Sequence, residues 1–188
     1  MSTTSSSVES STTPNPEIGP GLEALDMGPQ VGESGRDSTL DYIEVGQTEG
    51  AILEMGGDVP EDDRLPKGYL TEPMVFFSVE STMRIAQEGT FGPLPAVTGV
   101  DGFDEAIDIA NDIDYGLSES IIIEDHGEAD RFVDRTEVGV AKVNRKTTGL
   151  ELHMPFGGYK RSSSEALCEQ GYAGLQFYTI SKTVYDAY

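Results

Sequence analysis

The chain has 188 residues, which is enough for one domain with its own hydrophobic core. Its 34 acidic residues against 12 basic ones give a formal net charge of −22, and such a surface repels nucleic acid and anionic membranes. A single cysteine excludes an internal disulfide and a cysteine-cluster metal site, and the sequence has neither a run of about 20 apolar residues nor a signal-peptide core.

The acidic residues are spread along the chain and do not form a terminal tail. Distributed acidity with few lysines favours a cytoplasmic protein from a high-salt organism, because salt screens the self-repulsion of the charges. An acidic docking surface and ordinary solvated faces are the alternatives.

The first third of the chain is predicted to contain one helix and one short strand. Residues 1–17 form a Ser/Thr-rich leader with almost no apolar content, so we expect disorder there. Ile18–Gly32 is predicted to be a loop, because glycine and proline recur at short intervals. A helical stripe covers Ser38–Gly50, and a strand at Ala51–Met55 leads into a charged loop at Gly56–Gly68.

The next segment is predicted to hold two strands around a short helix. Tyr69–Val79 is rich in β-formers, and Pro73 places it at a sheet edge or a bend. Ser81–Glu88 is predicted to be a short helix. Leu94–Val100 is predicted to be a strand, with Pro95 again indicating an edge.

The third segment alternates helices and strands. Asp101 is predicted to cap an amphipathic helix that ends near residues 111–116, and Glu128–Thr136 forms a second one. Ser118–Ile123 is predicted to be a buried strand, and Val138–Asn144 another. This order predicts an α/β fold with a parallel sheet covered by helices.

A pocket wall is one interpretation of the segment after that strand. Gly157 and Gly158 allow a sharp turn that holds Phe156 beside it, although an ordinary buried ring fits the same spacing. Serines at 162–164 can cap a helix through Ala166 and Leu167. At the C-terminus the segments Leu175–Phe177 and Lys182–Tyr185 are β-prone.

No short motif assigns a catalytic or metal-binding residue. The phosphate-binding, zinc, calcium and metalloprotease spacings are absent from the sequence. His126 is expected to be solvated at a helix start, and His153 to make a loop hydrogen bond in preference to acting as a base. Cys168 is the only candidate thiol nucleophile, and the neighbouring Glu169 disfavours its thiolate.

The longest informative stretches are VNRKTTGLELHMPFGGYKRS at Val143–Ser162 and EQGYAGLQFYTISKTVY at Glu169–Tyr185. Together with five further motifs in a fixed order, they resemble the C-terminal part of the aldehyde dehydrogenase superfamily. The closest branch is that of the semialdehyde dehydrogenases, including α-ketoglutarate semialdehyde (2,5-dioxopentanoate) dehydrogenases. The further motifs are DMGPQV (Asp26–Val31), YIEVGQTEGA (Tyr42–Ala51), GYLTEPMVF (Gly68–Phe76), IAQEGTFGP (Ile85–Pro93) and NDIDYGLSESI (Asn111–Ile121).

This resemblance implies oxidation of an aldehyde or semialdehyde to a carboxylate with NAD or NADP, through a cysteine thiohemiacetal. The family's cysteine, its glutamate base, its oxyanion-hole asparagine and most of its cofactor domain lie upstream of the matched part. We therefore expect a truncated chain that is inactive alone and binds cofactor weakly. Cys168 stands where relatives commonly carry arginine, so we interpret it as a substitution and not as the nucleophile.

Two family positions can be carried over to this sequence. Phe91 of EGTFGP matches the residue that packs near the nicotinamide, whereas Gly89 replaces the glutamate that holds its ribose. Phe156 matches a residue lining the aldehyde tunnel, and Asn144 is expected to support its loop.

By the same resemblance, residues 18–160 form a partial catalytic domain, and residues 161–188 form a helix and an oligomerisation strand that joins a neighbouring subunit. Three hypotheses follow. The chain is an incomplete aldehyde dehydrogenase, or an interaction module that assembles with a full-length relative or a separate N-terminal half, or an independent acidic enzyme using Cys168 and His153.

Overall fold

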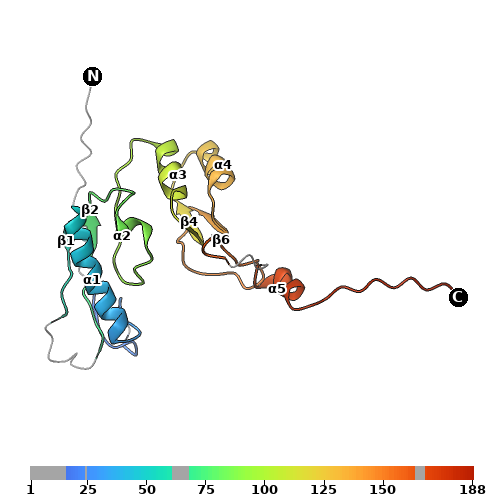
Figure 1. Ribbon diagram of the computed structural model, residues 1–188, viewed down its shortest axis with the longest axis horizontal. Helices are drawn as coiled ribbons and strands as arrows, with labels where there is room; N and C mark the ends of the chain where they lie inside the picture. Colours follow the sequence, from blue (N-terminus) through green and yellow to red (C-terminus); the bar gives the residue numbers. More distant parts are fainter. Residues whose placement is uncertain (1–15, 24, 61–67, 164–167) are drawn as a thin grey trace, which may run out of the picture. The chain divides into compact units, whose positions relative to one another are not determined.

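The computed structural model describes residues 16–23, 25–60, 68–163 and 168–188, which contain five helices and six short strands (Figure 1). The chain divides into two compact units, residues 1–98 and 99–188. The predicted disorder of the leader, most of the charged loop and the helix predicted through Ala166 and Leu167 lie outside the described residues.

The first unit is built around helix α1 (Glu33–Glu49) and the antiparallel pair β1 (Ile52–Met55) and β2 (Val75–Phe77). Gly50 ends α1 in the left-handed conformation, with φ at 103°, which glycine adopts without steric cost. A single turn, α2 (Arg84–Gln87), follows β2. The core of this unit consists of Ala51, Met74, Phe76, Val79, Met83, Ile85 and Leu94.

The segment after α2 returns alongside β2 in the parallel direction. The N–H groups of Met74 and Phe76 donate to the carbonyls of Pro93 and Pro95 at 3.1 and 2.9 Å. Val97 N–H in turn donates to Phe76 O at 2.8 Å. The strand predicted at Leu94–Val100 is thus an edge segment joined to β2 by one bridge, at Ala96, and Pro95 fits there because only its carbonyl is needed.

The second unit begins with α3 (Phe103–Asn111) and contains a parallel pair, β4 (Ser118–Ile121) and β5 (Val140–Val143), joined through α4 (His126–Arg135). The short strands β3 (Tyr115–Gly116) and β6 (Tyr159–Lys160) pair antiparallel, and α5 spans Gly171–Phe177. Among the described residues of this unit, the buried apolar side chains are Ile107 of α3 and Ala129 and Phe132 of α4.

The prediction of a parallel sheet covered by helices is correct only for β4 and β5. The strands in the described residues form three separate pairs, and β1–β2 and β3–β6 are antiparallel. A parallel connection needs a crossover long enough for a helix, and the loop after β1 has charges, glycines and prolines in place of a helical pattern. The mixed α/β class itself holds.

Three local predictions are wrong. Gly102, not Asp101, is the N-cap of α3, and the N–H of Asp101 donates to the Glu105 carboxylate at 2.5 Å. The strand predicted to be buried ends before Ile122, whose side chain is 78% exposed. Leu175–Phe177 belongs to α5 and forms no strand, because β-propensity counts only where a partner strand is present to pack against.

Within the described residues, no helix combines the length and the apolar character required to cross a bilayer. Residues 182–185 form no regular element, so the proposed oligomerisation strand there stays a prediction.

Candidate functional site

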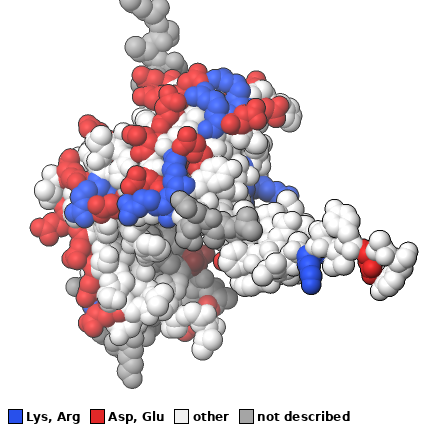
Figure 2. Space-filling view, turned by 45° about the vertical axis from the view of Figure 1, so that its right-hand side comes forward, with Lys and Arg blue, Asp and Glu red and all other residues white. Residues whose placement is uncertain are grey.

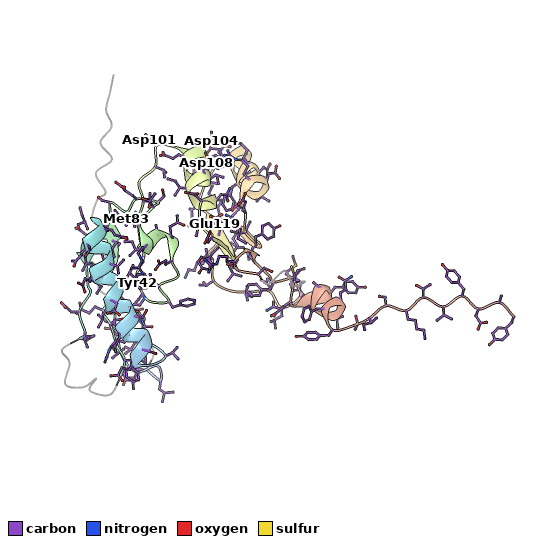
Figure 3. The ribbon with its side chains drawn as sticks, viewed as in Figure 1. Tyr42, Met83, Asp101, Asp104, Asp108 and Glu119 are labelled. Atoms are coloured by element: carbon purple, nitrogen blue, oxygen red, sulfur yellow. The ribbon has the colours of Figure 1, made fainter. Side chains whose placement is uncertain are left out.

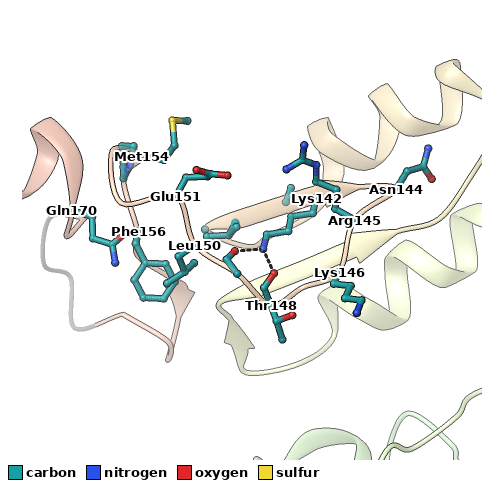
Figure 4. A pocket seen from close by; sticks show the side chains of 15 residues that line it. Lys142, Asn144, Arg145, Lys146, Thr148, Leu150, Glu151, Met154, Phe156 and Gln170 are labelled. Carbon is teal, nitrogen blue, oxygen red and sulfur yellow. Dashed lines mark hydrogen bonds between the residues drawn. The ribbon is translucent and has the colours of Figure 1, made fainter. Parts of the chain in front are cut away.

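A hollow of about 760 Å³ opens in the second unit beside β5 (Figure 4). Its walls are β5, the loop at 144–151, and the side chains of Met154, Pro155, Phe156 and Gln170. These residues lie between Val140 and Gly171, the part of the chain that contains the glycine turn and the aromatic ring of the predicted pocket wall.

Asn144 fixes the point at which β5 turns into the loop. Its φ of 53° lies in the left-handed region, which asparagine tolerates better than most residues. Its N–H donates to Ile121 O at 2.8 Å, and its side-chain amide both donates to Ile123 O at 2.9 Å and accepts from Ile123 N–H at 2.8 Å. These hydrogen bonds tie the end of β5, where the loop begins, to the residues at the end of β4.

Lys142 holds the loop closed from its other side. Its ammonium donates to the carbonyl oxygens of Thr147, Thr148 and Gly149 at 3.0, 3.0 and 2.6 Å, which uses all three of its N–H donors. Dashed lines in Figure 4 mark the bonds to Thr148 and Gly149. The hydroxyl of Ser118 on β4 also donates to Thr147 O, at 3.3 Å. Side chains of both parallel strands therefore set the shape of the loop.

Phe156 is held in the wall by a pair of backbone hydrogen bonds. Its N–H donates to Glu169 O at 2.7 Å, and Glu169 N–H donates to Phe156 O at 2.6 Å. The glycine turn after it is closely packed, because a Cβ at Gly158 would lie 2.6 Å from Ser162 Cβ and one at Gly157 would lie 3.1 Å from the Cys168 sulfur. The partly buried ring lines the hollow, and its contact with an aldehyde stays a prediction.

Phe91 lies in the first unit, beside a separate shallow hollow formed with Met27–Gln30, Gly92 and Pro93. Its ring is 94% exposed and its φ of 51° is unusual for an aromatic residue. A Cβ added at Gly89 would meet the ring at 3.2 Å. An exposed aromatic face fits a planar cofactor ring, whereas Gly89 offers no carboxylate for a ribose hydroxyl.

The carboxylate of the neighbouring Glu88 is already engaged by two other side chains of the first unit. Arg84 donates to its oxygens from Nε and Nη2 at 2.9 Å each, and the hydroxyl of Tyr42 donates at 2.7 Å. Tyr42 lies on α1 and is labelled in Figure 3. The Arg84 hydrogen bonds, followed by that of Tyr42, lower the pKa of Glu88 from 4.5 to about 2.

The other candidate residues do not assemble into a site. His126 is the first residue of α4 and is exposed, as predicted, and His153 is exposed in the loop before the glycine turn. Cys168 is exposed and lies against Gly157, where an added Cβ would be 3.1 Å from its sulfur. No metal-binding group of three or more His, Cys, Asp or Glu residues occurs in the described part of the chain.

Sequence reasoning missed the basic residues of the site. Lys142, Arg145 and Lys146 all line the hollow. The available signal was their spacing, three cations within five residues of a chain with a net charge of −22.

Comparisons with known proteins agree with the sequence motifs. The aldehyde dehydrogenase family profile matches residues 8–184. The chain is 60% identical to the α-ketoglutarate semialdehyde dehydrogenase of Haloferax volcanii over 172 residues, which cover 92% of this chain and 36% of that protein. It is 44% identical to the 2,5-dioxopentanoate dehydrogenase of Saccharolobus solfataricus, with coverages of 91% and 35%.

Among solved structures, betaine aldehyde dehydrogenase from Staphylococcus aureus in complex with NAD+ matches with a TM-score of 0.84 and 35% identity. The match covers 88% of this chain and 33% of that one. The chain thus spans about a third of the length of the curated relatives it matches.

Proposed function

On the premise that this chain belongs to the aldehyde dehydrogenase family, we propose that it forms part of a site that oxidises an acidic semialdehyde to a carboxylate, with NAD or NADP as electron acceptor. The observation that carries the proposal is the hollow walled by Phe156 and the loop at 144–151. The names of the two relatives given above, both acting on an acidic semialdehyde, support the substrate class.

In the overall reaction, aldehyde, water and NAD(P)+ give carboxylate, NAD(P)H and two protons. Phe156 provides apolar surface for the carbon chain of the aldehyde, since its ring lines the hollow. Phe91 provides an exposed ring face for the nicotinamide, which accepts hydride when the cofactor is bound. Because Gly89 has no side chain and Glu88 is occupied, we expect this chain alone to bind the cofactor weakly.

The chain does not supply the family's nucleophile in this proposal. Cys168 does not line the hollow, and no hydrogen bond to its sulfur from a lysine, arginine or histidine occurs in the described residues. Activation of a thiol requires such a neighbour or a helix N-terminus. The third hypothesis, an independent enzyme using Cys168 and His153, is therefore unsupported.

The test is to mix the pure 188-residue chain with α-ketoglutarate semialdehyde and NAD+ or NADP+ and to follow the absorbance of the reduced cofactor. We expect no reduction above the buffer rate. Cys168→Ser should leave this result unchanged. Turnover that disappears in the Cys168→Ser variant would show that the chain carries its own nucleophile, against the proposal.

A second candidate function is that of an interaction module, and the exposed C-terminus favours it. Ile180, Val184 and Tyr185 are 97%, 70% and 96% exposed, which leaves apolar surface for another chain to cover. The measurement is size-exclusion chromatography with light scattering in molar KCl, for the chain alone and mixed with the Haloferax volcanii enzyme. A mixed complex that Val184→Asp abolishes supports this function, and separate elution of the two proteins argues against it.

A further inference from the structure

We propose that Arg145 and Lys146 form a subsite that binds the carboxylate of the substrate at the edge of the hollow. The inference rests on the proposed function for its substrate class. It adds the residues that would distinguish an acidic aldehyde from a neutral or cationic one.

The first observation is that these two cations have no carboxylate partner, although the chain is rich in acid. Ten of the twelve basic residues are described, since Arg64 and Lys67 fall outside the described ranges. Arg145 and Lys146 form no ion pair with any described residue. Lys142 and Lys182 likewise have no carboxylate partner among the described residues, but Lys142 donates instead to three backbone carbonyl oxygens. Six of the ten do pair with Asp or Glu: Arg36, Arg84, Arg131, Arg135, Lys160 and Arg161.

The second observation is that the loop is held in place before any ligand arrives. Lys142 and Asn144 bind the loop backbone and the preceding strand ends, so Arg145 and Lys146 project from a fixed frame. The loop carbonyl oxygens accept hydrogen bonds from Lys142. They therefore do not compete with a bound anion for the charges of Arg145 and Lys146. A frame that is already ordered lowers the entropy cost of binding a small anion.

The third observation is the distribution of side chains around the hollow. Figure 4 shows Arg145 and Lys146 toward the Asn144 end, and Leu150 and Phe156 toward the opposite end. Glu151 is the one acidic side chain among the lining residues, against the two cations Arg145 and Lys146 that have no carboxylate partner. This arrangement suits a carboxylate with an apolar stem, and it disfavours an aldehyde that carries a positive charge.

The experiment is a titration of the isotopically labelled 188-residue chain with glutarate, an unreactive carboxylate, followed by the amide NMR shifts of residues 144–151. Glutarate should shift these amides saturably, and the affinity should fall as KCl is raised, since the cations are exposed. The neutral analogue 1,5-pentanediol should leave them nearly unchanged.

The variants separate charge from folding. Each of Arg145→Gln and Lys146→Gln should weaken glutarate binding about threefold and the double variant about tenfold, the size expected for exposed ion pairs. Glu151→Gln should tighten binding about threefold by the same measure. Lys182→Gln removes the same charge outside the hollow and should change nothing.

Unchanged affinity in the double variant, shifts confined to other residues, or equal shifts with 1,5-pentanediol would overturn the subsite. Because glutarate is not oxidised, these results do not depend on turnover. A failed oxidation assay and a failed subsite are therefore distinguishable.

Discussion

Glu88 joins two helices of the first unit through its carboxylate, which accepts hydrogen bonds from Arg84 on α2 and Tyr42 on α1. Its pKa of about 2 in the folded chain lies below the ordinary value of 4.5. A lowered carboxyl pKa contributes stability that is fully present above the unfolded value and is lost as pH falls through the folded one. For Glu88 this window runs from about pH 4.5 down to about pH 2.

We predict that Arg84→Gln raises the pKa of Glu88 from about 2 toward its ordinary value, because the largest cause of the shift is removed. The Tyr42 hydroxyl still donates, so the return is partial. The measurement is a carbon-13 NMR titration of the Glu88 carboxyl, and Arg36→Gln, which removes an ion-paired arginine of α1, serves as the control. A Glu88 that still titrates near pH 2 in Arg84→Gln would contradict the assignment.

The role of a residue can be predicted from the sequence where the residue belongs to a recognisable motif. It cannot be predicted where the role depends on contacts that only the folded loop creates. The glycines after Phe156 allow either a pocket wall or an ordinary buried ring, and the ring lines the hollow. The Lys142 hydrogen bonds to carbonyls five to seven residues onward have no sequence period to reveal them. The spacing of Lys142, Arg145 and Lys146 marks them as a basic cluster in an acidic chain, but only the loop conformation shows that they line a hollow.

Helix α1 contains two glycines whose surroundings differ sharply. Gly46 is buried, and a Cβ there would lie 3.0 Å from Phe76 Cε1 and 3.1 Å from Ile85 Cδ1. At Gly35 the nearest atom to an added Cβ is Gln30 Cβ, at 3.9 Å. Both glycines lie on α1, but core side chains pack closely against Gly46 only.

We predict opposite effects of alanine at these positions. Gly35→Ala should stabilise the chain by about 0.5–1 kcal/mol through helix propensity. Gly46→Ala should destabilise it by about 1 kcal/mol net, because overpacking against the fully buried Phe76 exceeds the same propensity gain. Urea denaturation followed by circular dichroism measures both, and a stabilising Gly46→Ala would show that the core can yield.

Helix α4 begins with a side-chain cap. Asp125 is the N-cap residue, and its carboxylate accepts from Glu128 N–H at 2.9 Å. We predict that Asp125→Ala lowers the free energy of unfolding by about 1 kcal/mol, since one backbone donor loses its partner. Asp130→Ala, which removes an exposed acid inside the same helix, should cost little. Equal effects of the two substitutions in urea denaturation would indicate a general charge effect and no cap.

Most helices and strands were predictable from periodicity, but their pairing was not. The pattern located α1, α2, α3, α4 and β5 to within a few residues at most ends. Strand direction depends on whether the intervening chain forms a crossover, and α4 provides one only between β4 and β5. The C-terminal segment was misassigned, because α5 forms where aromatic residues alone suggested a strand.

For the whole molecule, charge is the dominant physical property. Figure 2 shows acidic side chains spread over the face in view, with basic ones in smaller groups among them. Asp104 contacts both Arg131 and Arg135 of α4, and this pairing lowers the pKa of Asp104, chiefly through the Arg135 hydrogen bond. The remaining acids outnumber the cations available to them.

We predict that raising KCl from about 0.1 M to about 1 M increases the thermal unfolding midpoint, because screening over a shorter Debye length reduces repulsion among the acids. The control compares the unfolding midpoints at the same two KCl concentrations, at a pH near the carboxyl pKa values. Many acids are then neutral, so the increase in the midpoint should be smaller. A midpoint that does not respond to salt at pH 7 would contradict a role for self-repulsion and would favour ordinary solvated faces.

The most direct test of the central claim, that this chain forms the substrate side of an aldehyde dehydrogenase site, uses a graft. Residues 16–188 replace the matching part of the Haloferax volcanii enzyme, and kcat/KM is measured for α-ketoglutarate semialdehyde. We predict that the graft turns over this substrate and that Phe156→Ala in the graft lowers kcat/KM by about tenfold or more, since loss of apolar contact of this size is worth about 1–3 kcal/mol. A folded graft without turnover, or one indifferent to Phe156→Ala, would contradict the claim.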